Sequence, residues 1–178
     1  MAKTLIATQT ASADSSLSFT SGIDSTYDVY EFVFTNMHPA TDDQGITFQV
    51  NASGGSGFNE TITSAFFRAK HNEDDAADGL GYVADYDQQQ GTSYQRLCND
   101  VGNDNDQSTS GIFTLYAPSS TTYVKHFMAR FNETHASDIT MDNYVAGYIN
   151  TTSAIDEIDF KFSSGNIDAG TIKMFGVS

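Results

Sequence analysis

The sequence predicts an all-β protein, built as an antiparallel β-sandwich and most simply as a jelly roll of about ten to twelve strands. Three observations support this prediction. Apolar and polar residues alternate in many short segments, which places the apolar side chains on one face of each strand. Turn residues separate these segments at intervals of about ten to fifteen residues. No segment sustains a helical repeat over about ten residues.

The N-terminal half is expected to begin with an extended arm or an edge strand in residues 1–14, with Lys3–Gln9 as its extended part. The strongest strand signal of this half is Asp28–Met37, which is rich in β-branched and aromatic residues. The other predicted strands here are, in order, Ser15–Phe19, Gly45–Val50 and Thr61–Lys70.

The second half opens with residues 71–91, which are acidic and lack strong periodicity, so no strand is predicted there. The remaining predicted strands are Thr92–Cys98, Gly111–Ala117, Thr121–Asn132, Asn143–Asn150, Ile155–Phe162 and Gly170–Val177. In the segment before the Ser-Ser-Gly-Asn turn, alternation puts Ile158, Phe160 and Phe162 on one face. That turn predicts a hairpin between the last two strands.

Length and charge limit the classes of function. The chain has 178 residues, which fits a single sandwich domain over residues 1–178. Its net charge is −15, from 23 acidic against 8 basic residues. Affinity for nucleic acid needs clustered Lys and Arg, so a nucleic-acid partner is excluded. The same charge repels anionic membrane surfaces, and it helps many copies to stay in solution.

The compartment is indicated by the single cysteine, Cys98, which excludes an intramolecular disulfide and favours synthesis in a reducing cytoplasm. Cys98 follows Leu97 in an apolar stretch, which is typical of a buried core residue. The N-terminus lacks an apolar run long enough for a signal peptide, and no span approaches transmembrane length.

Two acidic loops are the candidate metal-binding segments. Asp74 and Asp75 lie in the first, and Asp104 and Asp106 lie in the second, beside several asparagines. Calcium takes six to eight oxygen ligands from carboxylates, amides and carbonyls, so these loops are a candidate calcium site. The alternative is a pair of solvated acidic loops without a metal. No cofactor other than calcium is expected.

Three tyrosines in or beside the polar middle region, Tyr82, Tyr86 and Tyr94, are candidates for stacking on a sugar or anchoring a protein partner. The alternative is that they are partly buried loop residues. The four histidines show no metal-binding spacing. The chain has no nucleophile elbow and no phosphate-binding glycine loop, so we expect no enzyme activity.

Several segments resemble small structural proteins of tailed bacteriophages, especially marine ones. These segments are Met1–Ile6, Phe19–Tyr27, Pro118–Lys125, Ser164–Ile167 and Gly170–Val177, and the likeness covers nearly the whole chain. The resemblance implies a β-sandwich displayed in many copies on the exterior of the virion, made in the host cytoplasm and without catalysis.

Two functions follow from this resemblance. The first is a capsid decoration (cement) protein that stabilises the head, as a homotrimer in contact with the major capsid protein or other virion proteins. The second is a tail-fibre or receptor-binding module that recognises host surface glycans, with the tyrosines and acidic loops as its site. A polysaccharide-degrading enzyme is a third, weaker alternative, because paired carboxylates occur in any acidic β-sandwich.

Overall fold

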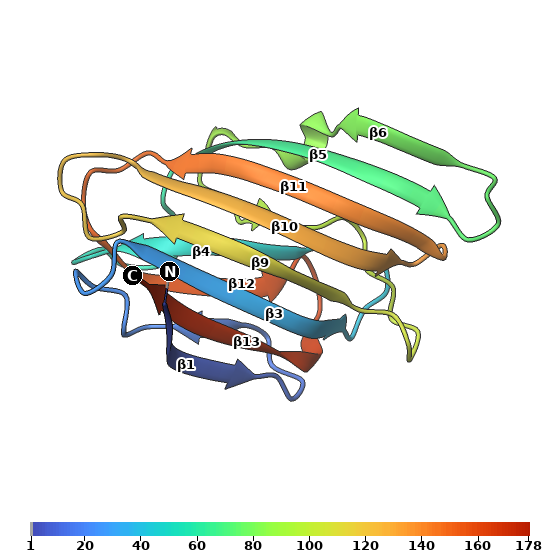
Figure 1. Cartoon of the computed structure of the whole chain (residues 1–178), viewed down its shortest axis with the longest axis horizontal. Helices are drawn as coiled ribbons and strands as arrows, with labels where there is room; N and C mark the ends of the chain where they lie inside the picture. Colours follow the sequence, from blue (N-terminus) through green and yellow to red (C-terminus); the bar gives the residue numbers. More distant parts are fainter. Residues whose placement is uncertain (1) are drawn as a thin grey trace.

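The computed structural model describes residues 2–178 as two antiparallel β-sheets packed face to face around one hydrophobic core (Figure 1). The predicted antiparallel β-sandwich is therefore confirmed. Met1, the first residue of the expected N-terminal arm, lies outside the described residues. Within residues 2–178 no helix is long and apolar enough to cross a membrane.

The larger sheet has nine strands and its uncovered face looks toward the viewer in Figure 1. In spatial order its main path consists of β1 (Lys3–Thr10), β13 (Ile167–Val177), β3 (Val29–Pro39), β9 (Thr109–Tyr116), β10 (Lys125–His135), β11 (Ile139–Ile149), β5 (Ile62–Asn72) and β6 (Asp78–Tyr82). The short strand β7 (Gln89–Gly91) also pairs with β5. The edge strand β1 joins the sheet through β13, so the two ends of the described chain lie side by side.

The smaller sheet has four strands, which lie behind the middle of the larger one. Its order is β2 (Leu17–Phe19), β12 (Ile155–Phe162), β4 (Ile46–Ala52) and β8 (Gln95–Arg96). The chain passes repeatedly from one sheet to the other, and the first and last strands of the smaller sheet are neighbours. This is jelly-roll order, with the meander β9–β10–β11 in the place of a single strand and with β13 and β1 added at one edge.

The predicted hairpin between the last two strands is wrong. β12 pairs with β2 and β4 in the smaller sheet, whereas β13 pairs with β1 and β3 in the larger sheet. Each of the two strands has an apolar face. The turn at residues 163–166 carries the chain from the smaller sheet to the larger one, so the two apolar faces lie opposite each other across the core. Ile158, Phe160 and Phe162 are buried on one side, and Ile172 and Met174 on the other.

The core is dominated by phenylalanines that meet edge to face between the sheets. The ring of Phe160 lies 4.9 Å from that of Phe34 and 5.9 Å from that of Phe113. The ring of Phe48 lies 4.6 Å from that of Phe113. Cys98 is fully buried at the margin of this core, as the sequence indicated.

The four-stranded sheet is too narrow to cover all nine strands, and the segment from Val83 to Val101 fills the remainder. Leu97 and Val101 are buried there, and Tyr86 packs its ring against Phe66 of β5 at 5.3 Å. Predicted strand Thr92–Cys98 is mostly irregular for this reason, and only Gln95–Arg96 pairs, with β4. Strands β6 and β7 form within residues 71–91, where no apolar alternation marks them.

Candidate functional site

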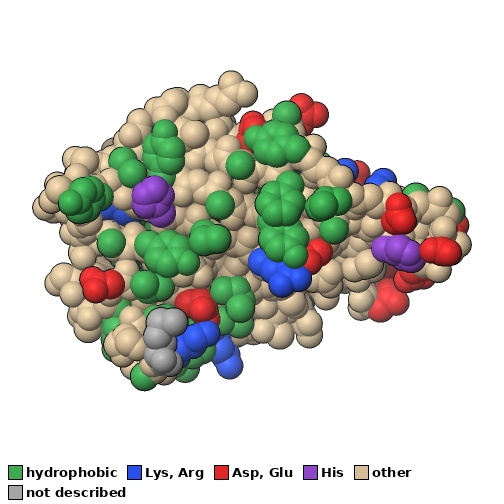
Figure 2. Space-filling model, turned by 45° about the horizontal axis from the view of Figure 1, so that its top comes forward, with side chains coloured by type: hydrophobic (Ala, Val, Ile, Leu, Met, Phe, Trp, Pro, Cys, Tyr) green, Lys and Arg blue, Asp and Glu red, His purple; other side chains and the backbone are tan. Residues whose placement is uncertain are grey.

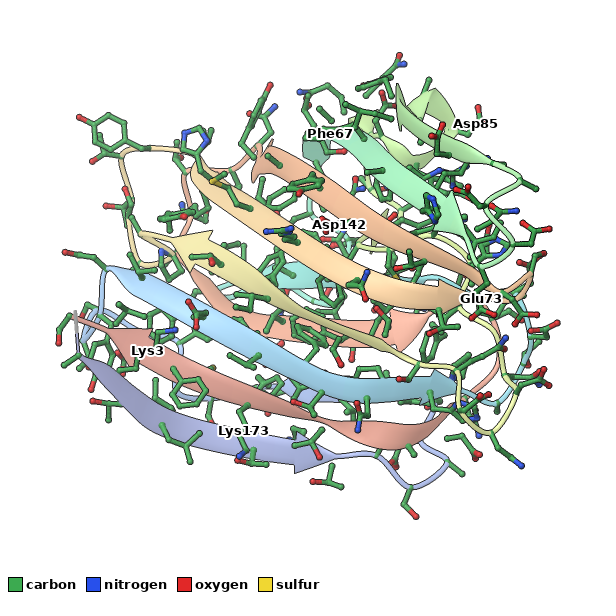
Figure 3. The ribbon with its side chains drawn as sticks, turned by 45° about the vertical axis from the view of Figure 1, so that its right-hand side comes forward. Lys3, Phe67, Glu73, Asp85, Asp142 and Lys173 are labelled. Carbon is green, nitrogen blue, oxygen red and sulfur yellow. The ribbon has the colours of Figure 1, made fainter. Side chains whose placement is uncertain are left out.

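The feature that stands out on the surface is the uncovered face of the larger sheet. Directly paired residues of neighbouring strands point to the same side of a sheet, so the strand register defines rows of side chains across it. One row runs from β6 to β1, one residue per strand. It consists of Tyr82, Phe67, Tyr144, Arg130, Ile112, Val33, Lys173 and Thr8. The register places all eight on one side of the sheet, opposite the smaller sheet, and Figure 3 labels two of them, Phe67 and Lys173.

A second row runs beside the first and is also mainly apolar. It consists of Ala65, Ala146, Met128, Thr114, Glu31, Phe175 and Leu5. We call these two rows together the outer apolar face. Figure 2 shows hydrophobic side chains spread over this side of the molecule, whereas acidic side chains gather at the end formed by the β5–β6 turn.

Large apolar side chains are concentrated on this face. Seven large hydrophobic residues are exposed among the described residues, and six of them lie in the two rows or directly beside them: Leu5, Phe67, Leu80, Tyr82, Ile112 and Met128. Single exposed apolar residues are common on soluble proteins, but a contiguous group of them marks a contact surface. The seventh, Tyr123, precedes β10 in a loop.

The polar groups at the centre of the face are held in fixed positions. The rings of Phe67 and Tyr144 stack at 4.8 Å. The guanidinium of Arg130 lies 5.0 Å from the Tyr144 ring and donates two hydrogen bonds to Asp142, from Nε at 3.0 Å and from Nη2 at 2.7 Å. These bonds hold the pKa of Asp142 below its usual value. The positive charge of Arg130 is thus balanced by the carboxylate of Asp142, beside the aromatic rings.

The charge of the face differs sharply from that of the whole chain. The two rows contain Arg130 and Lys173 against Glu31, a formal sum of +1, and the flanking residues Asp142 and Lys3 add one charge of each sign. The chain as a whole carries −15. The acidic residues therefore lie elsewhere, and this face is the part of the surface that another protein can approach without electrostatic repulsion.

The hollows that indent the molecule are shallow. One of about 450 Å³ lies on the uncovered face and is lined by Tyr116, His126, Met128 and Tyr148 among others. Another of about 340 Å³ lies beside it, around Ile112 and Arg130. Their size would admit side chains of a partner.

The predicted acidic residues lie in two separate turns. Asp74 and Asp75 are in the β5–β6 turn, and the Asp74 carboxylate accepts the backbone N–H of Ala76 at 3.0 Å. Asp104 and Asp106 are in the loop before β9. No three of these four carboxylates come within ligand distance of one another among the described residues. Calcium binding by these loops stays a prediction.

Residues that the sequence analysis did not single out, Asp43, Asp100 and His135, do bring three potential ligand atoms within 4.8 Å of one another. Their other bonds argue against a metal. Asp100 already accepts hydrogen bonds from Arg96 Nη1 at 2.7 Å and Tyr86 Oη at 2.9 Å. His135 Nδ1 accepts the Ser137 N–H at 3.0 Å, which places the proton of the neutral ring on Nε2, the nitrogen that faces Asp43.

The three predicted tyrosines do not form one site. Tyr82 is 60% exposed in the first row of the outer apolar face. Tyr86 is half-buried under Arg96, and burial raises its pKa to about 12. The Tyr94 hydroxyl donates to Asp159 at 2.9 Å beneath Lys161, and burial raises its pKa as well. Only Tyr82 is placed to meet a partner without rearrangement.

A buried acidic residue lies on the inner side of the larger sheet, near the C-terminal end of β10. Glu133 of β10 is 1% exposed, and its Oε2 accepts the Asn99 N–H at 2.9 Å. Its Oε1 has no hydrogen-bond partner among the described residues. Burial raises the pKa of Glu133 to about 7, although Cys98 and the Asn99 N–H act in the opposite direction. This group is inside the molecule and is not open to a substrate.

The chain is thus an antiparallel β-sandwich with one broad, exposed and mainly apolar sheet face. Comparisons of the chain with protein-family models, with curated proteins and with solved structures find no match. The sequence did contain a signal for the face. Strands β5, β10 and β11 carry apolar residues on both sides, with Phe67, Met128 and Tyr144 alternating against buried neighbours.

Proposed function

We propose that the protein is a non-enzymatic structural component on the exterior of a bacteriophage particle, most simply a capsid decoration protein that stabilises the head. The observation that carries the proposal is the outer apolar face, an uncovered sheet surface with a formal charge of only +1 on a chain of charge −15. A protein that acts by contact needs such a surface, and it needs no cleft that isolates a substrate from water.

Two further features fit this role. The Phe-rich core between two extensively hydrogen-bonded sheets makes a stiff unit, which suits a protein that carries load in a shell. The acidic residues at the β5–β6 turn and elsewhere disfavour binding to packaged DNA. In this proposal the outer apolar face binds neighbouring copies or the major capsid protein.

Quantitative mass spectrometry of purified particles tests the proposal. We expect the chain at a copy number comparable with that of the major capsid protein, and on the exterior, where it is accessible to antibody on intact particles. Absence from purified particles, or a level of only a few copies each, would overturn the decoration role.

A tail-fibre or receptor-binding module that recognises host glycans is the second candidate, favoured by one observation. Tyr82 lines a hollow of about 210 Å³ together with Arg68, Lys70 and Leu80. The exposed ring of Tyr82 is suited to stacking on a sugar. A glycan array, with Tyr82→Ala as the test and Tyr123→Ala, at another exposed tyrosine, as the control, separates this role from the first. Binding that only Tyr82→Ala abolishes would favour it.

A further inference from the structure

We infer that the outer apolar face binds a second copy of this chain, face to face, in a two-fold symmetric pair. The inference deepens the proposed function by naming the partner of that face. It rests on the size of the face, on its charge and on the distribution of ridges and hollows across it.

The size of the face matches that of a stable interface. Strands in a sheet lie about 4.8 Å apart, and residues on one side of a strand repeat about every 7 Å. The two rows of the outer apolar face and the next row, which contains His126 and Tyr148, therefore span roughly 35 Å by 20 Å over seven to eight strands. This gives about 700 Å² per copy, close to the roughly 800 Å² that each partner buries in a standard interface. Sheets also pack face to face in this way within sandwich proteins.

The charge distribution allows a second copy to approach through this face, although it opposes an approach through the rest of the surface. Two chains of charge −15 repel one another over most of their surfaces. The two rows sum to +1, and Arg130 and Glu31 are each paired within their own chain, with Asp142 and Lys3. When two such faces meet, no unpaired carboxylate of one copy comes close to a carboxylate of the other copy.

A two-fold pair requires that one face carry both a protruding part and its complement. The stacked rings of Phe67 and Tyr144 form the ridge. The hollow of about 450 Å³ lined by His126 and Tyr148 lies on the other side of Ala146, one row away. A two-fold axis that lies in the plane of the face and passes beside Ala146 places the ridge of each copy over the hollow of the other. Because the side chain of Ala146 is small and exposed, the two copies can approach closely there.

Sedimentation equilibrium and light scattering at micromolar concentration test the inference on the full chain. We expect the mass of two chains, kept or strengthened at high salt because the contact is apolar. Ala146→Glu, which puts two like charges near the axis, is expected to weaken the pair by at least about 100-fold. Tyr123→Glu, which changes an exposed apolar residue outside the face, is expected to leave it intact.

Thermal melting and circular dichroism of each variant show whether it is folded. If Ala146→Glu does not fold, Met128→Lys replaces it, because Met128 is 56% exposed on the same face. The inference would be overturned if the wild type had the mass of one chain or of three chains. It would also be overturned if a folded Ala146→Glu or Met128→Lys variant still formed pairs. The proposed function would survive a one-chain result if the protein is still abundant on particles.

Discussion

The rings of Phe67 on β5 and Tyr144 on β11 stack with parallel planes on the uncovered face of the larger sheet, and their centres lie 4.8 Å apart. Parallel stacking of directly paired aromatic residues leaves one broad side of the pair open, with Arg130 at one end and Tyr82 at the other. An aromatic ridge held in this way is ordered before any partner arrives, which lowers the entropic cost of binding.

Removal of a central core ring should destabilise the fold strongly. Phe160 packs against Phe34 and Phe113 across the two sheets and is fully buried. We expect Phe160→Ala to lower the free energy of unfolding by about 3–5 kcal/mol in chemical denaturation, because it leaves a cavity. The matched control Phe67→Ala removes a partly exposed ring and should cost about 1 kcal/mol or less. Equal losses for the two variants would contradict the assignment of core and surface.

Stability should fall as pH rises through the range in which Glu133 ionises. The pKa of Glu133 is about 7 in the folded protein against an ordinary value of 4.5, so the folded state binds this proton more tightly than the unfolded state. The free energy of unfolding therefore decreases between these two pH values, by at most about 3 kcal/mol. Cys98, Asp100 and Arg68 are the titratable groups that face it.

The variant Glu133→Gln isolates this contribution. It keeps the shape of the side chain but cannot ionise, so we expect it to be more stable than the wild type at pH 8 and nearly equal at pH 5. Denaturation curves at both pH values measure the difference. An unchanged pH dependence in the variant would show that another group is responsible.

Tyr94 should act within the fold and not as a contact residue. Its hydroxyl donates to Asp159, a buried carboxylate that also accepts a hydrogen bond from Ser18. We expect Tyr94→Phe to lower the free energy of unfolding by about 1–2 kcal/mol, because Asp159 loses a donor. Tyr82→Phe, at an exposed position, is the control and should change stability little. A neutral Tyr94→Phe variant would contradict this role.

Zinc should not stabilise the protein through Asp43, Asp100 and His135. The carboxylate oxygens of Asp100 are engaged by Arg96 and Tyr86, and the accepting nitrogen of His135 is engaged by Ser137. We therefore expect no shift in melting temperature on addition of zinc. A rise that His135→Gln abolishes would show that these hydrogen bonds give way to a metal.

The proposed calcium site in the acidic loops has its own test. If Asp104 and Asp106 hold calcium, the ion raises the melting temperature, magnesium does not, and Asp104→Asn with Asp106→Asn removes the rise. Asp74→Asn with Asp75→Asn tests the other loop in the same way. Asp168→Asn, an exposed acid on β13, is the control. No response to calcium in the wild type would overturn the proposal.

The sandwich was predictable because most strands alternate apolar and polar residues over their whole length. β12 was predicted with its observed bounds, Ile155–Phe162. Its partner was not predictable, because two neighbouring apolar strands can pair in one sheet or face each other across the core. Strand β6, with the sequence Asp-Gly-Leu-Gly-Tyr, is fully exposed and is held by backbone pairing with β5, so no burial pattern reveals it.

The candidate site was harder to predict. Tyr82 was singled out as a contact residue, but its neighbours on the face come from β5, β11, β10 and β9, which are distant in sequence. Only the register of the sheet aligns Phe67, Tyr144 and Ile112 with it. The buried Glu133 was missed for a similar reason, since its burial depends on the Val83–Val101 segment that closes the open side of the sandwich.

The most direct test of the central claim, that this chain acts by contact on a particle surface, is electron cryo-microscopy of intact particles that contain it. We predict many copies on the outside of the capsid, each with its outer apolar face covered by another protein chain. Particles without density for the sandwich, or with the Phe67–Tyr144 ridge open to solvent in every copy, would contradict the claim.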